Sequence, residues 1–257
     1  MQRRDVVEGL RRRLREVLRL SPSFPDFGSL SISIDQARAQ ADRTGLADVF
    51  FDHRGRKIHK WIHYLTVYER YLEDYRDTNV KMLEIGVSKG GSLEMWREYF
   101  GPAATIYGVD IDPACASHVS PTNQVRIGSQ DDPDFLRRVV DEMGSPDIVL
   151  DDGSHIGRHQ RVSFDVLFPL LKEAGLYIIE DMHTAYWPGP YEGGHCRKGT
   201  AIEHVKEMID DLHAWYHNRA TTTPARDQIG AIHIFDSITI IEKVAAKPRP
   251  AHTIVPD

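Results

Sequence analysis

Between residues 80 and 243, short apolar runs alternate with stretches of helical periodicity. The runs cover residues 81–87, 105–110, 124–128, 147–152 and 176–181, and the helical stretches cover 92–100, 113–118, 133–143, 158–172 and 200–218. Such runs are typical of parallel strands buried beneath helices. Two last strands, 229–235 and 238–243, are joined by two residues, which permits a hairpin but no parallel crossover. The sequence therefore predicts a doubly wound α/β fold with a mostly parallel sheet and an antiparallel C-terminal hairpin.

Residues before 80 have a different character. Helical periodicity covers 5–20, 33–50 and 59–75, and aromatic residues recur about once per turn in the last of these. An aromatic stripe of this kind is more often core than cofactor site. Its position before the first strand nevertheless leaves His59, His63 and Tyr64 as candidates to close a cofactor site. We expect a helical extension over 1–78 for oligomerisation or as a lid, an α/β domain over 79–245 and a loose tail over 246–257.

Composition excludes some classes of function. A net charge of −6 argues against a general nucleic-acid binder. The sequence contains no apolar stretch of the roughly 20 residues that a membrane span needs, and its charged N-terminus lacks a signal core. Two cysteines, Cys115 and Cys196, suit a reducing compartment. We therefore expect a cytoplasmic enzyme or binding protein without a membrane span.

Two pairs of acidic residues end neighbouring apolar runs. Asp151 and Asp152 close one run, and Glu180 and Asp181 close the next. Acids at the carboxyl ends of parallel strands lie where open α/β sheets bind ligands. Because crowded carboxylates resist ionisation unless a cation lies between them, the pattern predicts a site for a hard metal.

The predicted metal ligands are Asp152, Glu180 and Asp181, whose oxygens suit Mg²⁺, Mn²⁺ or Ca²⁺ better than softer ions. A metal there can bind adjacent hydroxyls of a substrate and lower the pKa of the one that reacts. His155, three residues after Asp152, is then the predicted general base. Asp151 is expected to support the turn or the cofactor. A helix cap plus a solvated acid is the alternative reading of the aspartate pair.

A glycine-rich turn follows the first strand, in the segment Leu-Glu-Ile-Gly-Val-Ser-Lys-Gly-Gly-Ser at 83–92. It lacks the GxGxxG spacing of a dinucleotide site and the GK[ST] of a phosphate loop. An acid two residues before the first glycine suits a ligand with an amino group, and an acid ending the second strand suits ribose hydroxyls. The adenine edge is expected near 128–132. Candidate cofactor contacts are Glu84, Gly86, Lys89, Gly91, Ser92, Asp110, Gln130, Asp131 and Asp151.

Together, the glycine-rich turn, the Val-Asp-Ile-Asp strand end at 109–112 and the terminal hairpin resemble the class I S-adenosylmethionine-dependent methyltransferases over residues 80–243. The resemblance implies a Rossmann-like, seven-stranded sheet with strand order 3-2-1-4-5-7-6. It also implies S-adenosylmethionine as the cofactor.

A narrower resemblance rests on Asp-Asp-Gly-Ser-His at 151–155 and on Glu-Asp-Met-His-Thr-Ala-Tyr-Trp at 180–187. These segments are similar to the metal-dependent sugar O-methyltransferases that modify macrolide deoxysugars, rhamnosyl groups or polysaccharides. The resemblance implies Mg²⁺ held by Asp152, Glu180 and Asp181, with His155 as base. A glycine-rich aromatic loop over 182–199 is expected as a lid, and its predicted substrate contacts are His183, Tyr186 and Trp187.

The sequence thus predicts an S-adenosylmethionine- and Mg²⁺-dependent O-methyltransferase. Its acceptor is expected to be a sugar hydroxyl of a glycosylated natural product, glycolipid or polysaccharide, and a homo-oligomer (dimer or tetramer) is expected. A catechol or small-phenol O-methyltransferase is the nearest alternative, since no physical argument excludes phenols. A binding module without activity and a nicotinamide oxidoreductase are weaker alternatives, the latter disfavoured by the missing GxGxxG.

Overall fold

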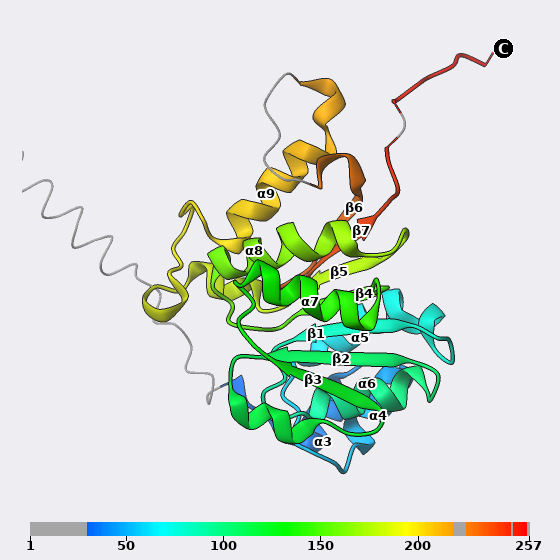
Figure 1. Ribbon diagram of the computed structural model, residues 1–257, viewed down its shortest axis with the longest axis vertical. Helices are drawn as coiled ribbons and strands as arrows, with labels where there is room; N and C mark the ends of the chain where they lie inside the picture. The colour runs from blue at the N-terminus through cyan, green and yellow to red at the C-terminus, as the bar shows by residue number, and fades with distance from the viewer. Residues whose placement is uncertain (1–29, 218–224, 248, 256–257) are drawn as a thin grey trace, which may run out of the picture. The chain divides into compact units, whose positions relative to one another are not determined.

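The computed structural model describes residues 30–217, 225–247 and 249–255. In this part of the chain a seven-stranded sheet has the order β3-β2-β1-β4-β5-β7-β6 (Figure 1). The strands are β1 Lys81–Ile85, β2 Thr105–Asp110, β3 Asn123–Ile127, β4 Ile148–Asp151, β5 Leu176–Ile179, β6 Ile229–Ile234 and β7 Thr239–Lys243. Strands β1 to β5 pair in parallel, whereas β7 pairs antiparallel with β5 and β6. The predicted fold class, strand order and terminal hairpin are confirmed.

Helices cover both faces of this sheet. The α-helices are α3 Ile34–Gln40, α4 Gly45–Asp52, α5 Ile62–Leu72, α6 Gly91–Phe100, α7 Pro133–Met143, α8 Gly157–Leu167 and α9 Ala201–Leu212. Short 3₁₀ turns are η1 Glu73–Tyr75, η2 Pro113–His118, η3 Phe168–Leu170, η4 Met182–Tyr186, η5 Gly189–Tyr191, η6 Ala214–Tyr216 and η7 Arg226–Gln228. Helices α7, α8 and α9 share one hydrophobic core with the sheet, and α4, α5 and α6 lie on the other face (Figure 1). No helix among the described residues is long and apolar enough to cross a membrane.

Helix α7 shows how local signals fix the elements. The Asp132 side chain accepts hydrogen bonds from the backbone N–H groups of Asp134 and Phe135, and Pro133 occupies the first helical position. The helix ends at Gly144, whose φ of 76° is in the left-handed region that favours glycine. Its bounds are those predicted, because cap, apolar stripe and terminator are all local in the sequence.

The segment before the sheet is less regular than predicted. The stretch 33–50 forms two helices, α3 and α4, which are joined by residues 41–44. Thr44 starts the second helix, because its side chain caps α4 by accepting a hydrogen bond from the N–H of Ala47. The stretch 59–75 becomes helical only at Ile62. Residues 59–61 therefore form a non-helical approach to the sheet. The predicted helix 5–20 lies outside the described residues.

Strand register positions the site. Ile85 of β1 is paired with Asp151 of β4, which is paired with Ile179 of β5. The backbone N–H of Asp152 donates to the carbonyl of Ile85 at 2.9 Å, and that of Glu180 donates to the carbonyl of Asp151 at 3.0 Å. Residues that follow these three strand ends are therefore held side by side at one edge of the sheet.

Candidate active site

A cleft of about 490 Å³ opens at this edge of the sheet. Of the residues predicted from the sequence, its lining contains His59, Gly86, Lys89, Gly91, Ser92, Asp110, Gln130, Asp152, His155, Glu180 and Asp181. Glu84, Asp131, Asp151, His183, Tyr186 and Trp187 are not among the lining residues. The cleft thus joins the glycine-rich turn to both acidic strand ends.

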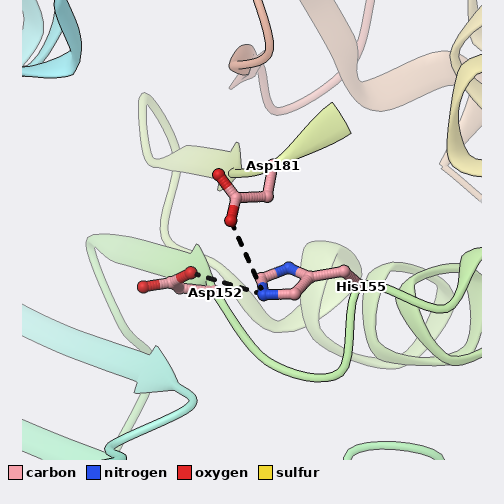
Figure 2. A group of neighbouring side chains, drawn as sticks. All are labelled: Asp152, His155 and Asp181. Carbon is pink, nitrogen blue, oxygen red and sulfur yellow. Dashed lines mark ion pairs between the residues drawn. The ribbon is translucent and has the colours of Figure 1, made fainter. Parts of the chain in front are cut away.

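A compact group of potential metal-binding atoms is formed by Asp152, His155 and Asp181. One oxygen of each aspartate and one ring nitrogen of His155 all lie within 4.8 Å of one another. Figure 2 shows both carboxylates turned toward Nε2 of His155, at 3.9 Å from Asp152 and 3.8 Å from Asp181. The two strand ends and the loop before α8 therefore bring an imidazole nitrogen and two carboxylate oxygens together.

Glu180 lies beside this group but has other partners. Its Oε1 accepts a hydrogen bond from Nζ of Lys60 at 2.5 Å and another from the hydroxyl of Tyr68. Lys60 also donates to Oδ2 of Asp152 at 2.6 Å. Burial would lower the pKa of Lys60, but the charges of Asp152 and Glu180 hold it above its ordinary value. Lys60 therefore remains an ammonium ion between the two acids.

The approach to α5 and the helix itself supply further partners to the acids. Trp61 Nε1 and the Tyr64 hydroxyl donate to Oδ1 of Asp181, at 3.1 and 2.9 Å. Burial, followed by the charge of Asp181, raises the pKa of Tyr64, so its hydroxyl stays a donor. The sequence predicted Tyr64 near the cofactor, but it marked neither Lys60 nor Tyr68 as a site residue. The Tyr64–Tyr68 spacing of one helical turn was the available signal, whereas nothing local marked Lys60.

Asp151 has a different environment from its neighbour Asp152. It is fully buried on the opposite side of the strand, where it accepts hydrogen bonds from Ser163, Tyr177 and Gln130. Burial raises the pKa of this carboxyl, and the bonds from Ser163 and Gln130 oppose that rise. These contacts tie β4 to α8 and β5.

Backbone atoms of other segments pack closely against the glycine-rich turn. A Cβ on Gly86, whose φ is 94°, would lie 2.0 Å from the carbonyl oxygen of Asp152. A Cβ on Gly91 would lie 2.4 Å from the carbonyl oxygen of Arg56 and 2.5 Å from that of Lys57. Glycine at 86 lets the turn lie against the residues that follow β4, and glycine at 91 lets the segment before α5 lie against the start of α6.

Glu84 and Asp110 lie beneath and beside this turn. Glu84 is fully buried and accepts from the hydroxyl of Ser92 at 2.9 Å. Burial raises its pKa to about 7, and the charge of Lys60 opposes the rise. Oδ2 of Asp110 accepts from the N–H groups of Val87 and Ser88, each at 2.9 Å. Asp110 thus orders the turn while facing the cleft.

A polar network closes the other end of the cleft. The side-chain oxygen of Gln130 accepts from the N–H of Ser154 at 2.6 Å, while its amide donates to Asp151. Asp131 lies 3.3 Å from Nε2 of His159, and Nδ1 of that ring is 2.9 Å from the hydroxyl of Ser154. The loop after β3 is therefore fixed to the loop after β4.

Aromatic rings extend from His155 toward the segment predicted as a lid. The rings of His155 and Tyr191 have centroids 6.5 Å apart, and those of Tyr191 and Trp187 are 5.8 Å apart. Trp187 packs on His183 at 4.6 Å, which in turn lies 5.6 Å from Trp61. Tyr186 is 45% exposed. The linked rings thus lie in and beside two short 3₁₀ turns, η4 and η5, within this segment.

Comparison with known proteins gives consistent results. No protein-family model matches the chain. L-olivosyl-oleandolide 3-O-methyltransferase of Streptomyces antibioticus is 43% identical over 185 residues, which make up 66% of this chain and 46% of that protein. A second relative, 8-demethyl-8-(2-methoxy-alpha-L-rhamnosyl)-tetracenomycin-C 3'-O-methyltransferase of Streptomyces olivaceus, is 35% identical over 254 residues, 93% of this chain and 59% of that protein.

Solved structures of MycE methyltransferase from the mycinamycin biosynthetic pathway match the fold. Its complex with Mg and SAH has a TM-score of 0.71 and 34% identity, covering 79% of this chain and 55% of that one. Its complex with Mg, SAH and mycinamycin VI has a TM-score of 0.68 and 32% identity, covering 83% and 54%.

The strand order and the cleft at the carboxyl ends of the strands define a class I methyltransferase fold. Within that class, the chain is a homologue of the sugar O-methyltransferases of macrolide and tetracenomycin biosynthesis. The resemblance drawn from the sequence is confirmed at this level. The chain spans about half the length of the curated relatives it matches.

Proposed function

We propose that the protein transfers a methyl group from S-adenosylmethionine to a sugar hydroxyl of a glycosylated natural product, with the help of a divalent metal. The observation that carries the proposal is the convergence of the glycine-rich turn, Asp152, Asp181 and His155 in one cleft. Methyl donor and acceptor hydroxyl must meet in line, so a single cleft holding both sites is what the chemistry requires.

The sugar acceptor is supported by the relatives. The two methyltransferases described above are named for olivosyl and rhamnosyl groups, and one MycE complex contains mycinamycin VI. A catechol acceptor would suit the same metal chemistry, but these relatives, at 43% and 35% identity, are named for sugar groups. A glycolipid or polysaccharide remains within the proposed class.

For the cofactor, Glu84 and Ser92 are the proposed partners of the amino group, and Asp110 of the ribose hydroxyls. Gly86, Lys89 and Gly91 form the turn around it, and Gln130 and Asp131 lie toward the adenine. The residues fit the group, because a buried carboxylate lies beside a turn whose Gly86 and Gly91 leave no room for a side chain. Asp151 is proposed to hold this wall in place through Gln130.

For the metal, Asp152, Glu180 and Asp181 are the proposed ligands of Mg²⁺ or Mn²⁺, a hard-oxygen set that fits such an ion. When bound, the ion lowers the pKa of the acceptor hydroxyl. His155 accepts the hydroxyl proton at Nε2 as the oxygen–methyl bond forms and the sulfur–methyl bond breaks. His183, Tyr186 and Trp187 are proposed to contact the acceptor, since the linked rings begin beside His155.

The direct test is methyl transfer itself. The protein is incubated with S-adenosylmethionine, Mg²⁺ and a panel of olivosylated, rhamnosylated and catechol acceptors, and products are examined by mass spectrometry. We expect a gain of one methylene mass only on glycosylated acceptors. Methylation of catechols alone would replace the sugar proposal by the phenol one.

We also propose that the chain is divided into an extension over 1–78, a methyltransferase domain over 79–245 and a tail over 246–257. We propose further that the protein is a dimer or tetramer and lies in the cytoplasm. Light scattering after size-exclusion chromatography tests the oligomeric state.

A further inference from the structure

Lys60 holds a position between the two acidic strand ends. Its side chain is only 1% exposed, and its ammonium group contacts Oδ2 of Asp152 at 2.6 Å and Oε1 of Glu180 at 2.5 Å. These oxygens come from the carboxyl ends of β4 and β5. A positive charge carried by the chain itself therefore occupies the space that joins the two acids.

The metal-binding atoms that Lys60 leaves available include a nitrogen of His155, which conflicts with the proposed role of His155 as the base. With Glu180 bound to Lys60 and Tyr68, the compact group is Asp152, Asp181 and His155. An ion held by that group would use the nitrogen of His155 as a ligand. A coordinated nitrogen has no lone pair for a proton, so His155 would no longer serve as a base.

We propose that Lys60 and the divalent cation compete for Asp152 and Glu180, so that metal loading displaces the Lys60 ammonium group. The displacement brings Glu180 into the ligand set and leaves His155 free to accept the proton. This inference rests on the proposed metal-dependent function and adds a residue that controls how the metal is bound.

The contacts around Lys60 allow its side chain to move away from the acids while its backbone stays in place. On one side of Lys60, Arg56 is held by Glu94 through its backbone N–H at 2.8 Å and its guanidinium at 2.9 Å. On the other side, Trp61 donates to Asp181. Both anchors are independent of Lys60, whose four-carbon stem can rotate. The exchange is therefore a side-chain movement.

The test measures Mg²⁺ and Mn²⁺ binding by isothermal titration calorimetry in the wild type, Lys60→Met and Lys57→Met. Lys57 is the matched control, because it lines the same cleft but is exposed. Removing the competing charge leaves the acids mutually repelled, so we expect at least about tenfold tighter metal binding in Lys60→Met. Lys57→Met should bind like the wild type, and Lys60→Arg, which keeps the charge, no more tightly.

A second readout covers a destabilised variant. If Lys60→Met is poorly folded without metal, its melting temperature should rise more on adding Mg²⁺ than that of the wild type. Equal or weaker metal binding in Lys60→Met, with no larger thermal shift, would show that Lys60 is a permanent structural partner and overturn the inference alone. Absence of metal binding in every variant would overturn both the inference and the metal role in the proposed function.

Discussion

At the scale of single residues, two of the converging side chains depend on unusual backbone. His155 has a φ of 55° and Asp181 a φ of 54°, both in the left-handed region that non-glycine residues seldom adopt. Such conformations cost free energy and persist where the surroundings impose them. Here they turn both side chains toward the same point (Figure 2).

The proposed base gives the first prediction. His155→Ala should lower turnover by about 10²- to 10⁴-fold, the usual contribution of a positioned acid–base group. Binding of S-adenosylhomocysteine should stay nearly unchanged, because His155 is not a proposed cofactor contact. Steady-state kinetics and calorimetry check the two parts. The exposed His213→Ala is the matched control, and full activity in His155→Ala would show the assignment wrong.

Glu84 gives a prediction on pH. Its carboxyl has a pKa raised to about 7 by burial, with Lys60 opposing and Asp152 adding to the rise. The carboxylate, not the neutral acid, attracts an ammonium group, so cofactor affinity should be full above pH 7 and fall as pH decreases. At pH 6 we expect roughly tenfold weaker binding of S-adenosylhomocysteine than at pH 8. Glu84→Gln should bind S-adenosylhomocysteine weakly at both pH values. If this variant kept the pH dependence of the wild type, the proposed role of Glu84 would be contradicted.

The paired acids show what sequence can and cannot resolve about a site. Alternation along a strand predicts that Asp151 and Asp152 face opposite sides. Which one reaches the cleft depends on Ser163 and Tyr177, which come from other elements and donate to Asp151. Lys60 illustrates the same limit, since its partners lie 92 and 120 residues away.

At the scale of elements, locally encoded boundaries were predicted best. Helix α7 has its cap, stripe and terminator within its own sequence. The helical stretch expected over 33–50 is divided into two helices, because capping by Thr44 starts a new helix at Gly45. The strand predicted over 176–181 ends at Ile179, since Asp181 adopts a left-handed conformation. Tertiary contacts thus redirect the chain at the residues that build the site.

The segment 53–61 before α5 is an element whose fixation can be tested. Glu94 of α6 holds it through Arg56 and lies 3.5 Å from His53. Glu94→Ala should release the segment from the glycine-rich turn and weaken cofactor binding by about fivefold, near 1 kcal/mol. Hydrogen exchange over 53–61 should increase. Glu98→Ala, exposed on the same helix, is the control, and equal exchange in both variants would contradict the idea.

At the scale of the whole molecule, the site draws on distant parts of the fold. The cleft lining comes from the segment before α5 and from the ends of β1, β2, β3, β4 and β5. The sequence predicted this convergence correctly, because parallel strand order fixes which ends meet. A ligand that contacts several of these strand ends should therefore raise the free energy of unfolding of the whole domain, and not only order one loop.

The last prediction follows from that bridging. A ligand at 100 times its Kd contributes about 2.7 kcal/mol to the free energy of unfolding. For a domain of this size, that corresponds to a rise in melting temperature of about 5–10 °C. We expect such a rise with S-adenosylhomocysteine and a further one when Mg²⁺ is added, measured by calorimetry. EDTA should reverse only the second. NAD is the control, because the turn lacks the glycine spacing of a dinucleotide-binding site. Stabilisation by NAD alone would contradict the proposed methyltransferase function.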